Sequence, residues 1–327
     1  MIGRDNEQTP HLGDSVLDSA LDSVRVGAIE AGGTKFVCGI GSMDGEIHDR
    51  ISFPTGPPEE TLAQAIDYFA GRGVQAIGVG SFGPIDLRPG SATYGFVTTT
   101  PKAGWANFDF LGTLRRSFDV PYGWDTDVNA AAYGEAIWGA ARGLDSCVYY
   151  TIGTGVGVGV YAEGRLLHGL LHPEGGHLRL RRHPDDTFAG CCPYHGDCLE
   201  GMAAGPALQA RWGVPGHELA ADHPAWEIEA HYIAESIAAA VLLLSPRRII
   251  LGGGVMQQEH LLPLIRQRAA ASLNGYVAAS ELAEGLGEYI VAPGLGTQSG
   301  LRGALALGIR ALEQSRSGLG DTSLSGV

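Results

Sequence analysis

Four potential metal ligands stand close together in the second half of the chain. Cys192, His195 and Cys198 follow one another at three-residue intervals, and His177 lies a short loop upstream. Thiolate sulfur together with imidazole nitrogen is a donor set that tetrahedral zinc accepts. The spacing is not that of a zinc finger, so we expect a structural zinc ion that clamps a local loop, residues 175–200, and not a separate zinc domain.

Neighbouring residues leave alternatives open. His168, His172 and His183 are rival ligands that spacing alone does not exclude, and Cys191 is an additional thiol beside the cluster. A cysteine-rich core loop with incidental histidines is the other interpretation. The proline, glycine and aspartate within residues 192–198 are typical of a turn, and they favour the metal.

Two carboxylates flank the metal ligands. Glu174 lies three residues before His177, and Glu200 follows Cys198 by two residues. A metal that holds this loop would also hold both carboxylates, and a carboxylate in a fixed position is a good acceptor for the hydroxyl groups of a polyol. The alternative interpretation is that both are solvated acids on the surface.

A glycine-rich turn between two apolar segments, residues 24–29 and 36–40, is a second kind of candidate site. We expect a β-hairpin here, which is neither a Walker loop nor a dinucleotide-binding fingerprint. The turn residues that would face a phosphate are Gly32, Gly33, Thr34 and Lys35. Glycines let backbone N–H groups approach a phosphate, while threonine and lysine add a hydroxyl and a charge. Alone, such a hairpin is more often only a turn.

The same pattern recurs in the second half of the chain. The apolar segments 148–152 and 158–161 enclose a second tip that contains Gly153, Thr154 and Gly155. Two such hairpins, one in each half, are more specific than either alone. They indicate two similar lobes that face a common nucleotide.

Two aspartates stand where a short strand, residues 122–125, gives way to an alanine-rich helix. Asp125 and Asp127 are both at this junction, and one of them could be the helix N-cap, a role worth about 1 kcal/mol. A carboxylate at such a junction is also well placed to act as a general base. Upstream, the polar loop 98–108 offers Asn107 as a partner for a sugar hydroxyl, although a surface loop with Trp105 packed on the core fits equally well.

The composition limits the possible partners. The 327 residues suffice for one large or two medium domains, and the net charge of −14 argues against nucleic-acid binding. Five cysteines, three of them in one loop, fit a metal in a reducing compartment better than a disulfide framework, which predicts a cytoplasmic protein. Cys38 and Cys147 lie in apolar segments and read as inert core residues.

The ends of the chain read as disordered. Residues 1–23 are polar and acidic and lack the basic start and apolar run of a signal peptide. The tail from Glu313 is rich in serine and glycine. No apolar run long enough to span a membrane occurs, so we expect no membrane association.

The motifs also occur together, in the same order, in a known family. They are Glu30-Ala-Gly-Gly-Thr-Lys35, Asp125-Thr-Asp-Val-Asn129, Thr151-Ile-Gly-Thr-Gly-Val-Gly157, the His172–His177 and Cys192–Glu200 blocks, and Leu251-Gly-Gly-Gly-Val255. Over residues 25–312 the chain resembles the ROK group of sugar kinases, most of all its bacterial fructokinase branch. The resemblance implies the two-lobed α/β fold of the actin/hexokinase-like (ribonuclease-H-like) superfamily with a zinc-binding loop, and a homodimer.

The resemblance implies a role for each motif. Asp127 would be the general base that deprotonates the sugar hydroxyl, and Asn129 would support it or the sugar. Glu30 would help to position Mg²⁺ through water. The residues that would bind ATP are Gly32, Gly33, Thr34, Lys35, Thr151, Gly153, Thr154, Gly155 and Gly157, with Gly252, Gly253 and Gly254 beside the adenosine. Those that would bind sugar hydroxyls are Glu174, His177 and Glu200, His177 also ligating zinc.

The motifs indicate the reaction more specifically than they indicate the sugar. The opening motif and the loop at residues 100–105 resemble those of enzymes that phosphorylate fructose, which implies fructose 6-phosphate as product. Gly175 stands where relatives often carry a larger residue, commonly methionine, and Val158 where glycine is common. Both departures could alter the shape of the sugar site. Glucose, mannose and N-acetylmannosamine therefore remain alternatives.

A function of another class is also open: a sugar-responsive regulator or a sugar-binding protein without catalysis. Related regulators carry a DNA-binding region ahead of the first strand, whereas only residues 1–23 precede it here. We expect an N-terminal lobe over residues 24–133, a C-terminal lobe over residues 134–299, and a terminal helix, residues 300–312, that packs back on the N-terminal lobe.

Overall fold

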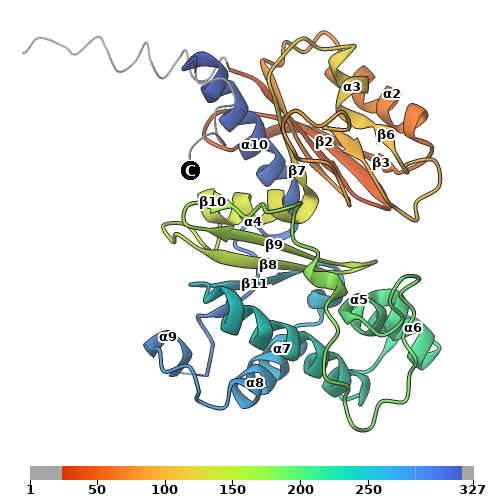
Figure 1. Cartoon of the computed structure of the whole chain (residues 1–327), viewed down its shortest axis with the longest axis vertical. Helices are drawn as coiled ribbons and strands as arrows, with labels where there is room; N and C mark the ends of the chain where they lie inside the picture. Colours follow the sequence, from red (N-terminus) through yellow and green to blue (C-terminus); the bar gives the residue numbers. More distant parts are fainter. Residues whose placement is uncertain (1–23, 284, 319–327) are drawn as a thin grey trace, which may run out of the picture.

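The chain forms two lobes of the same design in a computed structural model, which describes residues 24–283 and 285–318 (Figure 1). The first lobe is built on a sheet with the strand order β3 (Ile47–Pro54), β2 (Lys35–Gly41), β1 (Val26–Ala31), β4 (Ala76–Ser81) and β7 (Tyr122–Thr126). The second sheet has the order β10 (Arg165–Leu166), β9 (Val156–Ala162), β8 (Cys147–Ile152), β11 (Ile249–Gly252) and β12 (Ile290–Val291).

The two sheets match strand for strand. In each, an antiparallel hairpin is extended by a third antiparallel strand on one side and by two parallel strands on the other. The central strands β1, β4, β8 and β11 are almost entirely buried, as expected for strands covered on both faces. The predicted two-lobed α/β fold is confirmed, and both glycine-rich turns are the tips of corresponding hairpins.

Helices cover both sheets. They are α2 (Pro58–Phe69), α3 (Phe110–Arg115), α4 (Asp127–Trp138), α5 (Leu199–Ala203), α6 (Gly205–Trp212), α7 (Ala225–Leu244), α8 (Leu261–Leu273), α9 (Ser280–Ala283) and α10 (Ser299–Arg316). A two-stranded sheet, β5 (Phe96–Val97) with β6 (Phe108–Asp109), lies in the first lobe. None of the helices in the described part of the chain combines the length and the apolar character needed to cross a membrane.

Helices α4 and α10 cross between the two sheets, and glycines set how closely (Figure 1). A Cβ built on Gly303 would lie 1.8 Å from the carbonyl oxygen of Ala130, and one built on Gly134 would meet the backbone of α10. Buried Glu135 of α4 then secures the start of α10, because its carboxylate accepts hydrogen bonds from Ser299 and from the backbone N–H groups of Gly294 and Leu295. The last helix is thereby attached to the helix that begins at Asp127.

Two expected boundaries are wrong. The division between residues 133 and 134 falls inside α4, which packs on α10 and on strands of both sheets and so belongs to neither lobe alone. The terminal helix continues beyond residue 312 to Arg316, whose guanidinium donates to Gln75, so the tail does not begin at Glu313. Residues 1–23 and 319–327, expected to be disordered, lie outside the described residues.

Apolar packing explains several residues that sequence reasoning left open. Trp105 is fully buried among Phe36, Phe82 and Phe110, and its indole N–H donates to the Gly56 carbonyl, so it is a core residue. Cys147 is likewise buried, which raises the pKa of its thiol to about 12. Such a thiol is protonated at neutral pH and therefore unreactive.

Candidate active site

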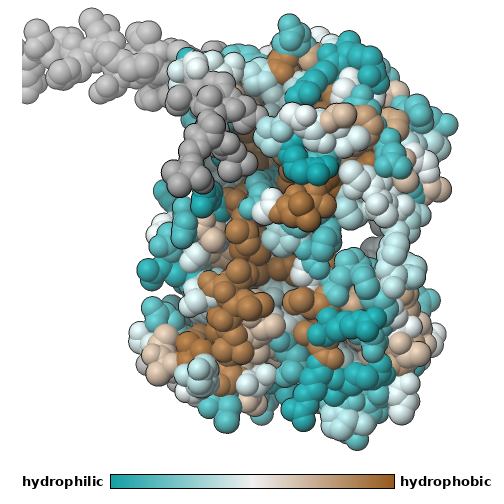
Figure 2. Space-filling view, in the orientation of Figure 1, coloured by the Kyte–Doolittle hydropathy of each residue, from teal (hydrophilic) through white to brown (hydrophobic). Residues whose placement is uncertain are grey.

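The surface is hollowed between the two lobes, at the right of the view in Figure 2. Strand β1, the start of α4, the loop before the metal cluster and α5 each bring one carboxylate to a common site. Asp127 lies close enough to Glu30 and to Glu174 to raise the pKa of each by charge repulsion, and Glu200 acts on Glu174 in the same way. The structure therefore gathers four of the acidic residues that the sequence singled out.

Asp127 is the first residue of α4, and Thr126 is the N-cap, whose hydroxyl accepts from the Asn129 backbone N–H. One carboxylate oxygen of Asp127, Oδ1, accepts from the N–H of Val128 at 2.8 Å. Burial raises the pKa of Asp127 to about 6 although that hydrogen bond opposes the shift. A carboxylate with this pKa is ionised at neutral pH yet basic enough to take a proton.

Glu30 lies near the end of β1, two residues before Gly32 of the first hairpin tip. Burial, and then the charge of Asp127, raise its pKa to about 7, while Lys35 acts in the opposite direction. Two carboxylates that repel each other in a half-buried position form a favourable site for a divalent cation, because the cation would offset the repulsion. The residues present thus fit the expected Mg²⁺.

Glu174 and Glu200 approach the site from the side of the metal loop. Burial, followed by the charges of Asp127 and Glu200, raises the pKa of Glu174 to about 7. Its side chain is nevertheless 44% exposed, so a ligand can reach it. Glu200 Oε2 accepts from the Val156 N–H at 3.1 Å and lies where a Cβ on Gly155 would be only 2.7 Å away.

Asn129 lies in the protein interior, whereas we expected it at the sugar site from the sequence. It is 0% exposed, its Nδ2 donates to Asp125 at 2.8 Å, and its Oδ1 accepts from the Val160 N–H at 3.2 Å. Asp125 is also buried and pairs with His168 at 2.8 Å. Asn129 therefore joins α4 to β7 and β9 and presents no surface to a sugar, which corrects its assignment as a substrate-binding residue.

The four predicted metal ligands converge. Their donor atoms all lie within 4.8 Å of one another. Nδ1 of His177 is 3.5 Å from the Cys198 sulfur and 3.8 Å from the Cys192 sulfur, and Nδ1 of His195 is 3.8 Å from the same Cys192 sulfur. In a tetrahedral zinc site, sulfur and nitrogen ligands are separated by about 3.6 Å. The donor set and its spacing thus fit zinc.

The rival ligands lie elsewhere. His168 pairs with Asp125, His172 accepts from the Ile85 N–H, and His183 packs on His231. Cys191 is exposed beside the cluster and is absent from the convergent set. Long-range packing decides this choice, which spacing could not.

The second hairpin tip borders a cavity of about 510 Å³. Gly153 and Thr154 line it on one side, and Gly254 lines it from the end of β11. Of the three expected adenosine-side glycines, only Gly254 faces this cavity. Gly253 has a φ of +95° and makes the turn, and a Cβ on Gly252 would collide with Tyr149. Gly157 instead makes room for Val128 of α4.

Sequence reasoning missed much of this cavity. Its other walls come from α6 and the segments after it and after β11, and include Gly205, Pro206, Leu208, Gln209, His217, Trp226, Gln257 and Gln258. The one available signal was Gly205-Pro206, a helix start that follows the metal loop directly. The Gly205 N–H donates to the Gly153 carbonyl at 2.7 Å, which holds the second tip against α6.

The first hairpin tip is more exposed. Gly33, Thr34 and Lys35 are all exposed, and the Thr34 carbonyl accepts from the Thr55 N–H at 3.0 Å. Asn107 is exposed too, with a φ of +56°. Thr151 is half-buried in β8 opposite Gly157. Their predicted contacts with ligands stay predictions.

Gly175 and Val158, the two departures from the family pattern, face each other. A Cβ on Gly175 would lie 2.9 Å from Cγ2 of Val158, which is buried in β9. The short turn Gly175–His177 thereby lies directly on β9, between Glu174 and the metal ligands. The two departures form one packing contact and are not independent changes.

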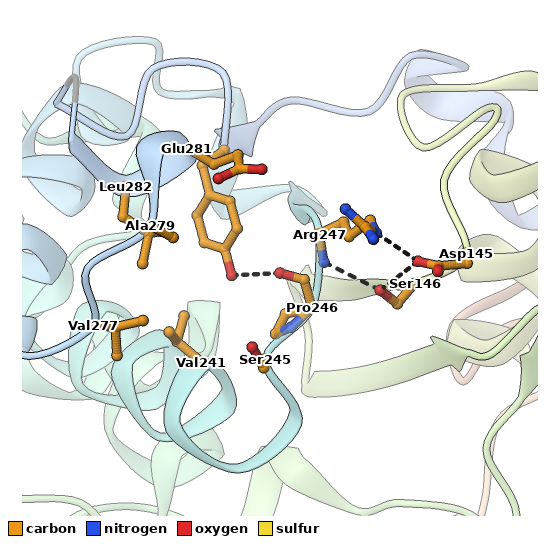
Figure 3. A pocket seen from close by; sticks show the side chains of 11 residues that line it. Asp145, Ser146, Val241, Ser245, Pro246, Arg247, Val277, Ala279, Glu281 and Leu282 are labelled. Atoms are coloured by element: carbon orange, nitrogen blue, oxygen red, sulfur yellow. Dashed lines mark hydrogen bonds and ion pairs between the residues drawn. The ribbon is translucent and has the colours of Figure 1, made fainter.

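A second cavity, of about 380 Å³, lies away from these residues, beside the C-terminal end of α7 (Figure 3). Its polar groups are engaged with one another: the Tyr289 hydroxyl donates to the Pro246 carbonyl, and Arg247 donates to Asp145. It shares no lining residue with the cavity at the second tip.

Comparison with known proteins finds relatives of one family over most of the chain. The family model described as "ROK family" matches residues 26–311. A putative fructokinase of Bacillus subtilis is 53% identical over 88% of this chain and 96% of its own length, and a fructokinase of Pediococcus pentosaceus is 50% identical over 89% and 99%. A ROK hexokinase structure from Thermus thermophilus, 28% identical, superposes with a TM-score of 0.71 over 89% of this chain and 100% of that one. A ROK glucokinase of Streptomyces griseus, solved with glucose and AMPPNP, has a TM-score of 0.69 at 25% identity over 88% and 99%.

Proposed function

The chain belongs to the ROK family, and from this premise we propose that it is an ATP-dependent fructokinase that converts D-fructose to fructose 6-phosphate. Relatives of 50–53% identity that cover nearly its whole length carry the names fructokinase and putative fructokinase. The observation on which the proposal rests is Asp127, a half-buried carboxylate with a pKa of about 6 whose charge acts on both Glu30 of the first hairpin and Glu174 beside the metal loop. A site for binding alone would not need a base there.

Asp127 would act on the sugar. Because its Oδ1 is held by the Val128 N–H, Oδ2 is the oxygen free to accept the proton from the 6-hydroxyl. As that proton moves to Asp127, the sugar oxygen attacks the γ-phosphorus, and the bond to the β-phosphate oxygen breaks to release ADP. Phosphoryl transfer depends on position and charge neutralisation more than on covalent catalysis, so one base suffices.

The nucleotide would lie across the two tips. The cavity beside Gly153, Thr154 and Gly254 is large enough for an adenosine, and the first tip would approach the phosphates with its backbone N–H groups, Thr34 and Lys35. Glu30 would help to position Mg²⁺ through water, and the cation would neutralise charge on the transferring phosphoryl group when bound. Thr151 would support the second tip from within β8.

The sugar would be bound from the metal loop. Glu174 is partly exposed, Glu200 keeps Oε1 free, and His177 uses Nδ1 for the metal, which leaves Nε2 for a hydroxyl. Asn107 is a further candidate partner. Four protein ligands close the coordination shell of zinc, so we infer a structural role in which the ion fixes the loop and does not contact the sugar. We also propose that the protein is a cytoplasmic homodimer. Light scattering of the purified protein would test the oligomeric state.

The decisive experiment is a coupled ADP-release assay with Mg·ATP over fructose, glucose, mannose and N-acetylmannosamine, combined with zinc analysis of the purified protein. We expect a strong preference for fructose, about one zinc per chain, and loss of activity when a chelator removes the metal. Preference for another sugar would contradict fructose but keep the kinase. Binding of a sugar by calorimetry without turnover would contradict the kinase and favour a sugar-binding protein.

A further inference from the structure

His172 lies between the two lobes and touches both the first lobe and a residue of the sugar site. It belongs to the segment that runs from β10 to Glu174, and its side chain is 1% exposed. Nε2 accepts from the backbone N–H of Ile85 in the first lobe at 3.0 Å. Nδ1 lies 3.3 Å from Oε1 of Glu174 and 3.4 Å from the Pro173 carbonyl oxygen.

These contacts determine which nitrogen carries the proton. Burial lowers the pKa of His172, so the ring is neutral and has one donor and one acceptor. Nε2 faces an N–H group and must be the acceptor, which places the proton on Nδ1, within reach of both the Pro173 carbonyl oxygen and Oε1 of Glu174. The ring therefore links the Ile85 backbone N–H of the first lobe with the Glu174 carboxylate.

Gly83 leaves room for the contact between His172 and Glu174. A Cβ on Gly83 would lie 3.3 Å from Cε1 of His172 and 3.4 Å from Oε1 of Glu174, so a side chain there would crowd the His172 ring and contact Glu174. The same segment is attached to the first lobe a second time, because His168 pairs with Asp125 at the end of β7 at 2.8 Å.

We propose that His172 is a positioning residue for the sugar: its Nδ1–H orients the Glu174 carboxylate, and its Nε2 ties that carboxylate to the first lobe through Ile85. This inference rests on the proposed function of Glu174 as a sugar ligand. His172 itself lies behind Glu174 and does not touch the substrate.

Two substitutions separate the two halves of this role. His172→Gln keeps an amide oxygen near the position of Nε2, as an acceptor for the Ile85 N–H, but removes the donor to Glu174. His172→Asn keeps an amide donor near the position of Nδ1 but is too short to reach Ile85. His48→Gln is the matched control, because His48 is an exposed histidine of β3.

Kinetics test the orienting half. Loss of a hydrogen bond to a charged group costs roughly 1.5–3 kcal/mol, so we expect His172→Gln to raise the KM for sugar at least about tenfold, with kcat and the KM for ATP within about twofold. His172→Asn should raise the sugar KM clearly less. Equal effects of the two variants, an unchanged sugar KM in His172→Gln, or a parallel rise in both KM values would overturn the proposal.

Amide hydrogen exchange of the peptide that contains Ile85 tests the tether without any turnover. Exchange should quicken in His172→Asn and stay slow in His172→Gln and His48→Gln. Unchanged exchange in His172→Asn would overturn the proposed tether to Ile85. If the wild type phosphorylates no sugar, the proposed function fails while this result still stands. If the His172 variants do not fold, Gly83→Ala is the alternative variant: its Cβ crowds the His172 ring and leaves the residue in place, and it should also raise the sugar KM.

Discussion

The two hairpin tips occupy equivalent positions in matching sheets, but their attachments differ. The first tip lies between β1 and β2 and is exposed, and its external support is Thr55, which follows β3 and donates from its N–H to the Thr34 carbonyl and from its hydroxyl to the Gly32 carbonyl. The second tip, between β8 and β9, is held from two sides: Gly153 accepts from the Gly205 N–H of α6, and the Val156 N–H donates to Glu200.

The metal loop accounts for this difference. Glu200 follows Cys198 by two residues at the start of α5, and α6 begins directly after that helix. A zinc ion that fixes the loop therefore also fixes the second tip and one wall of the nucleotide cavity. The second tip is thus supported by α5 and α6, whereas the first is supported only by Thr55, and we expect the first tip to be the one that moves onto the phosphates when the lobes close.

The largest effect on activity should come from a change at Asp127, which belongs to α4 and to neither hairpin tip. Asp127→Asn removes the base but keeps size and the acceptor for the Val128 N–H, so we expect kcat to fall about 10²–10⁴-fold with both KM values nearly unchanged. Steady-state kinetics with circular dichroism as a check on folding would measure this. Full activity in the variant would exclude Asp127 as the base.

Matched changes at the two tips would sharpen the comparison. Glu200→Ala removes the acceptor for the Val156 N–H and a proposed sugar ligand, and we expect the KM for ATP and for sugar to rise about tenfold each, as for the loss of a charged hydrogen bond. Thr55→Val at the first tip removes only the hydroxyl that donates to the Gly32 carbonyl. It should change either KM less than about threefold, because neutral hydrogen bonds contribute less. Equal effects at both tips would contradict unequal preorganisation.

Glu30 should make stability depend on pH at the first tip. Its pKa is about 7 in the folded protein against 4.5 as the ordinary value, so the folded state binds the proton more tightly between these values. This contribution to stability is present at pH 4.5 and is lost as the pH rises through about 7. We expect Glu30→Gln to raise the thermal midpoint relative to wild type more at pH 8 than at pH 5 in the absence of nucleotide and metal. The exposed Glu59→Gln is the control, and an equal shift at both pH values would refute the assignment.

The smallest effect concerns the turn that carries Glu174. Gly175→Ala places a Cβ 2.9 Å from Val158, and overpacking of this kind costs about 1–3 kcal/mol. Val158→Ala in the same chain removes the Cγ2 contact, although its Cβ stays 3.0 Å away, so the double variant should be more stable than the sum of the single changes predicts, by about 0.5–3 kcal/mol. Denaturant unfolding of the four proteins would measure the coupling. Additive effects would show that the residues do not press on each other.

The local parts of this protein were predictable from residue type and spacing. The ligands Cys192, His195 and Cys198 are close in sequence, so a turn suffices to bring them together. The hairpins were predictable for the same reason, because a glycine-rich turn between two apolar segments determines strand pairing locally. Asp127 could be singled out because the start of a helix is a local signal as well.

Tertiary structure alone decided how these parts meet. Asn129 stands one turn after Asp127, but packing of α4 between β7 and β9 buries its amide and removes it from the sugar site. His172 was a candidate metal ligand by spacing. Its Nε2 instead accepts a hydrogen bond from the Ile85 N–H of the first lobe, 87 residues away in the chain. Gly175 and Val158 were two separate departures until the turn was seen to lie on β9. Sequence spacing determines which groups are near one another along the chain, whereas close packing between distant elements determines which of them face the ligand.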